Sequence, residues 1–147
     1  MKLKTSKFGE IEINNENIIS FPGGIYGFEK EKEFALINSG QKNFFWLQSL
    51  KTANLSFLLT EPSWFMPQYS QLLEREFLIY KFMPERYMIF LTAYFKKESK
   101  KIFSNIGAPI IIDKINRLGT QIILKFSEMG YNIDILEYIK GKEKIKC

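Results

Sequence analysis

Short apolar runs separated by glycine, proline and asparagine limit the folds open to this chain more than any other feature. Residues 10–13 alternate polar and apolar side chains, which is typical of a half-buried strand. Similar strand-like segments follow at residues 18–21, 33–37, 44–50, 55–60, 86–95, 101–106, 109–112 and 120–126. Short strands at a spacing of about 8–12 residues indicate antiparallel sheets, so we predict an all-β, mainly antiparallel fold, a small pseudo-barrel or sandwich.

Two regions depart from this strand pattern. Residues 70–81 carry apolar side chains at near-helical spacing behind Ser70, a residue type that often caps helices, so we predict one short helix there. A strand over residues 77–82 is the alternative. Residues 132–140 fit either a helical extension or a strand.

The segment at residues 109–112 is apolar on both faces. Ile110, Ile111 and Ile112 leave no polar face toward water, so we place this strand in the middle of the structure. Pro109 lacks a backbone N–H group, which fits the start of a strand or an edge.

The length of 147 residues fits one domain. We assign residues 1–139 to that domain and residues 140–147 to a lysine-rich tail. The single cysteine, Cys147, excludes a disulfide within the chain. The longest uncharged stretch, residues 62–73, is too short to span a membrane, so we expect a soluble, cytoplasmic protein without membrane contact.

The positive charge of the chain is concentrated in two short segments. Residues 140–147 contain four lysines and one glutamate, and so do residues 96–101, which gives each segment a net charge of +3. The chain as a whole carries +5, so the remainder carries about −1. We interpret both segments as solvated charge at a hairpin tip and a frayed end, with an anionic partner as the alternative.

The residue types on which most catalytic and metal sites depend are scarce. The chain contains no histidine, and its one cysteine cannot build a metal cage. It also lacks the glycine-rich sequence of a phosphate-binding P-loop. We therefore predict no catalytic residues, no cofactor and no metal site, and we do not expect an enzyme.

Three segments with glycine, proline or a lone amide each allow a structural and a functional interpretation. In residues 21–29, the glycines shape a turn that Phe28 anchors in the core, or the loop presents Tyr26 to a partner. In residues 45–49, Gln48 needs hydrogen-bond partners inside the protein or at an interface.

The third segment, residues 59–69, is the strongest candidate for an interaction surface. It places Trp64, Phe65, Met66 and Tyr69 around two prolines, where an exposed loop would normally be polar. Aromatic residues and methionine are enriched at interface cores, although core packing is the alternative. If Trp64 contacts a partner, Trp64→Ala should weaken binding and leave the thermal midpoint nearly unchanged, whereas a large fall in the midpoint would assign Trp64 to the core.

An ordered set of motifs resembles the FliW family of flagellar assembly factors. The motifs lie at residues 9–13, 18–21, 24–29, 46–49, 60–62, 69, 105–112 and 119–124, and together they cover nearly the whole chain. The chain departs from the family pattern at Tyr26 and Glu61, where proline and aspartate are usual, and in its basic tail.

The resemblance implies a β pseudo-barrel that binds flagellin in the cytoplasm. It also implies binding of the translational repressor CsrA, which the factor antagonises once flagellin has been exported. We expect the partner-binding residues to include Glu61, Trp64 and Tyr69, with Phe28 and Asn105 as further candidates.

The alternative function is a small basic β-barrel that binds RNA directly through its lysines and exposed aromatic residues. We expect no direct nucleic-acid binding, because the lysine segments are not interleaved with the aromatic residues in the sequence.

Overall fold

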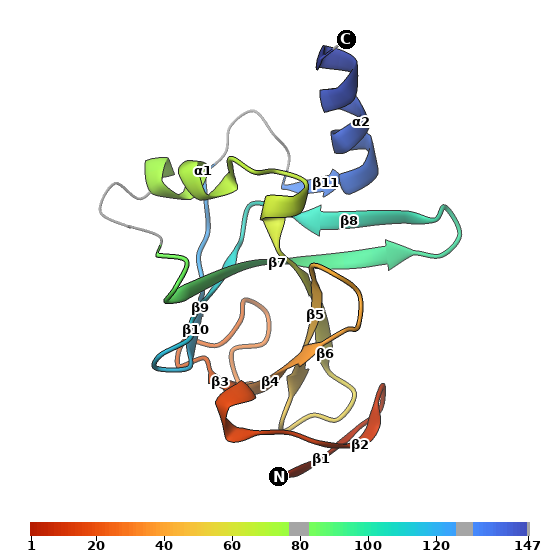
Figure 1. Ribbon diagram of the computed structural model, residues 1–147. Coiled ribbons are helices and arrows are strands. Elements are labelled where there is room, and N and C mark those ends of the chain that lie inside the picture. The colour runs from red at the N-terminus through yellow and green to blue at the C-terminus, as the bar shows by residue number, and fades with distance from the viewer. Residues whose placement is uncertain (77–82, 126–130, 147) are drawn as a thin grey trace.

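Strands are the main regular elements of the computed structural model, which describes residues 1–76, 83–125 and 131–146 (Figure 1). In chain order the strands are β1 (Lys2–Thr5), β2 (Gly9–Glu12), β3 (Ile18–Ser20), β4 (Glu33–Asn38), β5 (Phe44–Ser49), β6 (Ser56–Thr60), β7 (Tyr87–Lys96), β8 (Lys101–Asn105), β9 (Ile110–Asp113), β10 (Leu118–Gln121) and β11 (Asn132–Asp134). The described chain also contains the 3-10 helices η1 (Asn15–Asn17) and η2 (Pro62–Trp64), and the α-helices α1 (Tyr69–Glu76) and α2 (Ile135–Lys146). The predicted all-β, mainly antiparallel fold is confirmed.

Strand β7 closes the barrel because it has three different partners along its length. Residues 87–90 pair with β9, residues 91–93 pair with β6, and residues 93–96 pair with β8. The strand order β7-β6-β5-β4-β3-β10-β9 therefore returns to β7, and only the β3–β10 pair is parallel among these described strands. Beyond this ring, β7 and β8 continue as a long hairpin that projects from the barrel (Figure 1).

Alternate residues of β7 and β9 pack into two different hydrophobic clusters. Phe90, Ile110 and Ile112 belong to the cluster inside the barrel. Ile89, Leu91 and Ile111 belong to a second cluster, which includes residues of α1 and α2. The three consecutive isoleucines are buried because both faces of β9 are covered, as their pattern predicts.

Two predicted elements differ from the structure. The strand expected at residues 120–126 ends as β10 at Gln121, although the Ile122 and Leu124 N–H groups still donate to the Pro109 and Gly107 carbonyls, at 3.0 and 2.8 Å. Helix α1 begins at Tyr69, so Ser70 lies inside it and does not cap it. The remainder of that prediction, residues 77–82, lies outside the described residues.

Both ends of the chain contain elements that the sequence left open or did not indicate. Strand β1 pairs with β2 in a separate hairpin, and only β2 was expected. Residues 132–140 contain the end strand β11 and then the start of α2, so each alternative holds for part of the segment. The tail boundary expected after residue 139 falls within α2.

The turn at residues 21–29 depends on the backbone conformation of its glycines. Gly24 has a φ of +70°, and an added Cβ would lie 2.6 Å from the Glu29 Cα atom. Phe28 is 41% exposed and packs edge-on against Phe57, with ring centroids 5.1 Å apart. The interpretation that buries Phe28 in the core is therefore wrong, because its ring covers Phe57 from the outside.

Gln48 finds partners for its amide nitrogen inside the protein. The fully buried Gln48 Nε2 donates to the backbone carbonyls of Ser49, Thr52 and Ala53, at 3.1 to 3.3 Å. Hydrogen bonds from the Thr52 and Ser49 hydroxyls lower the pKa of the Glu31 carboxyl. These contacts hold the loop between β5 and β6 in place.

Candidate partner-binding groove

The proline-bounded segment after β6 forms a tight helical turn. Pro62 begins η2, a position that requires no backbone N–H donor. The Phe65 and Met66 N–H groups both donate to the Pro62 carbonyl, at 3.1 and 2.8 Å. This turn leads into α1, with the Phe65 and Met66 side chains buried beneath it.

Trp64 is held by contacts within the protein. Its Nε1 donates a 2.8 Å hydrogen bond to the Thr60 hydroxyl. Its ring lies 5.9 Å from the Phe44 ring and 5.3 Å from the Phe65 ring, measured between centroids. The side chain is half-buried, so it combines a packing role with a limited exposed surface.

Tyr69 is a core residue in this conformation. Its side chain is 1% exposed, and its hydroxyl donates a 2.6 Å hydrogen bond to the Ile106 carbonyl. Burial raises the pKa of the Tyr69 hydroxyl, which keeps it protonated as a donor. The contact fixes the start of α1 over the end of β8.

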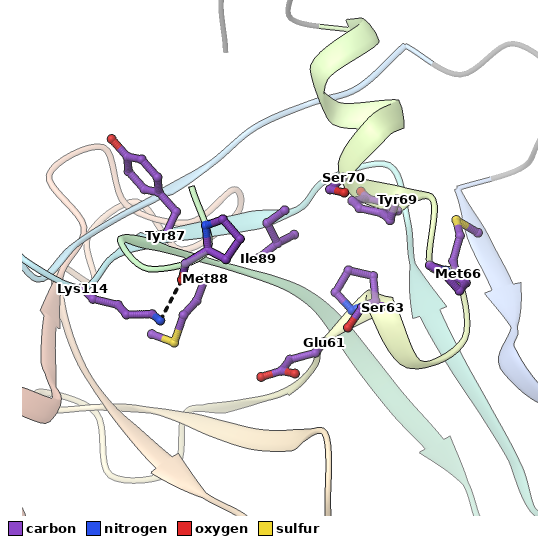
Figure 2. Close-up of a pocket in the computed structure, with 12 residues that line it drawn as sticks. Glu61, Ser63, Met66, Tyr69, Ser70, Tyr87, Met88, Ile89 and Lys114 are labelled. Atoms are coloured by element: carbon purple, nitrogen blue, oxygen red, sulfur yellow. Dashed lines mark hydrogen bonds between the residues drawn. The ribbon is translucent and has the colours of Figure 1, made fainter. Parts of the chain in front are cut away.

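An apolar groove of about 240 Å³ lies beside this segment (Figure 2). One wall comes from the segment itself, with Glu61, Pro62, Ser63, Met66, Pro67, Tyr69 and Ser70. The other wall comes from the start of β7 and the end of β9, with Pro84, Tyr87, Met88, Ile89 and Lys114. The groove is smaller than a typical small-molecule site of about 300–1,000 Å³, and its size suits a few side chains of a partner.

Polar and ionic contacts fix the second wall. Lys114 Nζ donates to the Pro84 carbonyl at 3.0 Å (Figure 2). One residue earlier, the Asp113 carboxylate lies 3.1 Å from the Arg86 guanidinium. This contact is the main reason why the pKa of Asp113 falls to about 2, with hydrogen bonds from the Asn116 and Ile115 N–H groups contributing.

The lining of the groove suits binding better than bond-breaking chemistry. Met88 offers a half-buried, adaptable apolar surface, and Glu61 supplies a carboxylate to the same groove, whereas Met66 lies buried at its edge. The described residues include no group of three or more histidine, cysteine, aspartate or glutamate side chains placed to hold a metal ion. Among the described helices, none has the length and apolar character needed to cross a membrane.

The five predicted partner-binding residues lie in different places. Glu61 and Tyr69 both line the groove, but the Tyr69 side chain is almost completely buried. Trp64 belongs to η2 but is not a lining residue. Phe28 lies on the 21–29 turn, and Asn105 Oδ1 accepts a 2.9 Å hydrogen bond from the Gly107 N–H group.

The opposite wall was not identified from the sequence. Tyr87, Met88 and Lys114 reach the groove through the pairing of β7 with β9, in which Tyr87 lies opposite Asp113 and Met88 opposite Ile112. No local motif encodes a pairing between strands so far apart in the chain. The strand predicted at residues 86–95 was the one available signal, and a predicted strand does not specify its partner.

The fold and the groove together define a small closed β-barrel protein with a helical layer and an apolar groove on its outside. A family model described as FliW protein matches residues 2–135. The chain belongs to the FliW family.

Curated relatives match over almost the whole chain. It is 35% identical to the flagellar assembly factor FliW of Treponema denticola, covering 92% of this chain and 94% of the relative. It is 32% identical to the flagellar assembly factor FliW of Lachnoclostridium phytofermentans, covering 98% and 96%. A crystal structure of the flagellar assembly factor FliW superimposes with a TM-score of 0.75 at 29% identity, covering 92% of this chain and 96% of that one.

Proposed function

We propose that this protein is a non-enzymatic flagellar assembly factor that binds flagellin in the cytoplasm. The main support is the match to relatives named flagellar assembly factor FliW, which extends over nearly the full length of both chains. A second part of the proposal is translational control. Once flagellin has been exported, the freed protein binds CsrA and relieves repression of flagellin translation.

The groove is the surface that we assign to flagellin. Its apolar lining is flanked by the exposed side chain of Ser63 and the half-buried carboxylate of Glu61, so a partner would meet both on entering. Apolar side chains of flagellin would displace water from Met88, Pro67 and Pro84, which is the main source of affinity in such interfaces. Tyr69 would support the groove from within, and Trp64 would hold η2 in position.

A blocking variant tests this assignment. Ser63→Arg places a bulky charged side chain at the groove, and we expect it to weaken flagellin binding by about a hundredfold or more, as at an interface centre. Ser6→Arg makes the same change at an exposed position in the turn between β1 and β2 and should leave affinity unchanged. Isothermal titration calorimetry with purified flagellin measures both. Equal flagellin affinities of the two variants would show that flagellin does not bind at the groove.

A competition experiment tests the regulatory part. The protein is first bound to CsrA, and flagellin is then added while the CsrA complex is followed by size-exclusion chromatography. We expect flagellin to release CsrA. Failure of the protein to bind CsrA at all would reject translational control and leave flagellin binding standing.

A further inference from the structure

The hairpin that projects from the barrel carries aromatic residues and lysines side by side. We call residues 94–103 the hairpin arm. Tyr94 stacks on Phe103 across the two strands, with ring centroids 5.2 Å apart and an interplanar angle of 18°. Lys96 Nζ lies 5.4 Å from the centroid of the Phe103 ring. These lysines are not interleaved with the aromatic residues in the sequence, but strand pairing places Lys96 beside Phe103 in the structure.

Both faces of the arm expose apolar surface. Tyr94 is 46% exposed on one face, and Phe95, which points to the opposite face, is 55% exposed. Exposing large aromatic side chains to water is unfavourable in free energy. Two of them on adjacent residues of a projecting strand therefore indicate a surface that a partner covers.

The arm also has a strand edge that is open in the described structure. Strand β7 pairs with β6 only as far as Ala93, opposite Leu58. From Tyr94 to Lys96 the described pairing is with β8 alone, on the other side. Alternate backbone N–H and C=O groups along this edge can therefore accept another strand.

The lysines at the tip make the isolated arm electrostatically unfavourable. Lys96 and Lys101 are direct cross-strand partners, and like charges in that position destabilise a hairpin. Lys97 and Lys100 add two exposed ammonium groups, whereas Glu98 is the one acidic residue of the turn. Lys101 is partly neutralised by Asp134 at 3.7 Å, which leaves the β7 side of the tip as the more positive one.

We propose that the free edge of the hairpin arm binds an extended acidic segment of a partner protein, which adds as a further strand beside residues 94–96. Backbone hydrogen bonds would hold the segment, Phe95 and Tyr94 would pack against its side chains, and Lys96 and Lys97 would pair with its carboxylates. The same lysines oppose pairing between two copies of the arm, because edge-to-edge contact would bring like charges together.

An extended peptide fits these features better than single-stranded nucleic acid. Bases stack on exposed ring faces, but the Phe103 ring is already engaged by Tyr94 and Lys96. The open backbone edge has no counterpart in nucleic-acid stacking, whereas it is the main feature recognised in strand addition.

The first test uses synthetic peptides, so it is independent of any natural partner. The acidic probe alternates glutamate with valine and threonine, and the basic probe has lysine in place of each glutamate. We expect the acidic probe to bind and the basic probe not to bind by NMR titration of the full chain. The amide protons of residues 94–96 that face the open edge should exchange more slowly with solvent when the acidic probe is bound.

A charge-reversal pair identifies the site. Lys96→Glu with Lys97→Glu should weaken binding of the acidic probe by about tenfold. This variant should fold, since the carboxylate introduced at position 96 would face Lys101 and replace a repulsive pair with an attractive one. Lys42→Glu with Lys140→Glu makes the same net change at two exposed lysines elsewhere and should keep the wild-type affinity.

Three results would overturn the proposal. They are equal binding of both probes, equal weakening by the two double variants, and unchanged exchange at the amides of residues 94–96. Binding of a homopolymeric single-stranded RNA that is lost in the Lys96→Glu, Lys97→Glu variant would assign the arm to nucleic acid instead.

The Lys96→Glu, Lys97→Glu variant also tests whether flagellin binds to the arm. This test rests on the proposed function. Wild-type protein that binds flagellin, with about tenfold weaker binding in the arm variant, would place an acidic flagellin segment there. Unchanged flagellin affinity in the arm variant would separate the arm from flagellin binding. Wild-type protein that does not bind flagellin would reject the flagellin proposal, whereas the peptide result would stand.

Discussion

The Tyr69 hydroxyl donates a 2.6 Å hydrogen bond to the backbone carbonyl of Ile106, and both residues are closed to solvent. One partner belongs to α1, which continues the groove wall, and the other follows β8, which forms half of the hairpin arm. This single contact therefore joins the groove to the strand that leads into the arm.

Removing the Tyr69 hydroxyl should lower stability without changing the fold. Tyr69→Phe leaves the Ile106 carbonyl buried without this donor, and we expect the free energy of unfolding to fall by about 1–3 kcal/mol. Denaturant unfolding followed by circular dichroism measures the change. Tyr26→Phe, at a tyrosine that is 58% exposed, serves as the control and should unfold like the wild type. Equal stability of Tyr69→Phe and wild type would mean that water replaces the hydroxyl.

Trp64 should contribute to stability as well as to any partner contact. Its indole bonds to Thr60 and packs on two phenylalanine rings, so Trp64→Ala should lower the free energy of unfolding by about 2 kcal/mol or more. Trp64→Phe keeps a ring and removes only the donor, so its effect should be about 1 kcal/mol. Thermal unfolding compares the two. The sequence-based expectation of a nearly unchanged midpoint would hold only if Trp64→Ala melts close to the wild type.

The sequence predicted the positions of the strands better than it predicted the tertiary contacts of individual side chains. Three isoleucines in a row require cover on both faces, and that requirement is enough to place β9 between two clusters. Tyr69 is different, because an aromatic residue between polar ones fits an interface and a core equally well. Its burial depends on the distant Ile106 carbonyl, which no local pattern specifies.

The hairpin tip predicted at residues 96–101 is confirmed, but neither the groove nor the aromatic pair of the arm could be predicted from the sequence, for a related reason. Tyr94 and Phe103 are nine positions apart, yet strand register makes them neighbours on one face. The groove needs β7 and β9 to pair across the chain. Periodicity gives the face on which a side chain lies, but register and strand order come from long-range packing.

Two glycines in one turn should respond differently to the same substitution. Gly24 and Gly27 both have positive φ, at +70° and +87°, so alanine is strained at each. Only at Gly24 would the new Cβ meet backbone, 2.6 Å from the Glu29 Cα, whereas Gly27 has open space. We expect Gly27→Ala to cost about 1 kcal/mol of unfolding free energy and Gly24→Ala clearly more. Chemical denaturation of both variants tests this order, and a larger loss for Gly27→Ala would contradict it.

The Arg86–Asp113 pair should make stability depend on pH in acid. Because the pKa of Asp113 is about 2 in the folded protein, below its ordinary value of 3.8, folding favours the charged carboxylate. Its contribution is therefore complete above about pH 4 and is lost as the pH falls toward 2. Asp113→Asn keeps a side-chain oxygen for the Ile115 and Asn116 N–H groups but has no charge to titrate. The difference in unfolding free energy between wild type and this variant, measured by urea titration at several pH values, should shrink as the pH falls through that window. A difference that stays constant from neutral pH to pH 2 would show that the pair is not linked to folding.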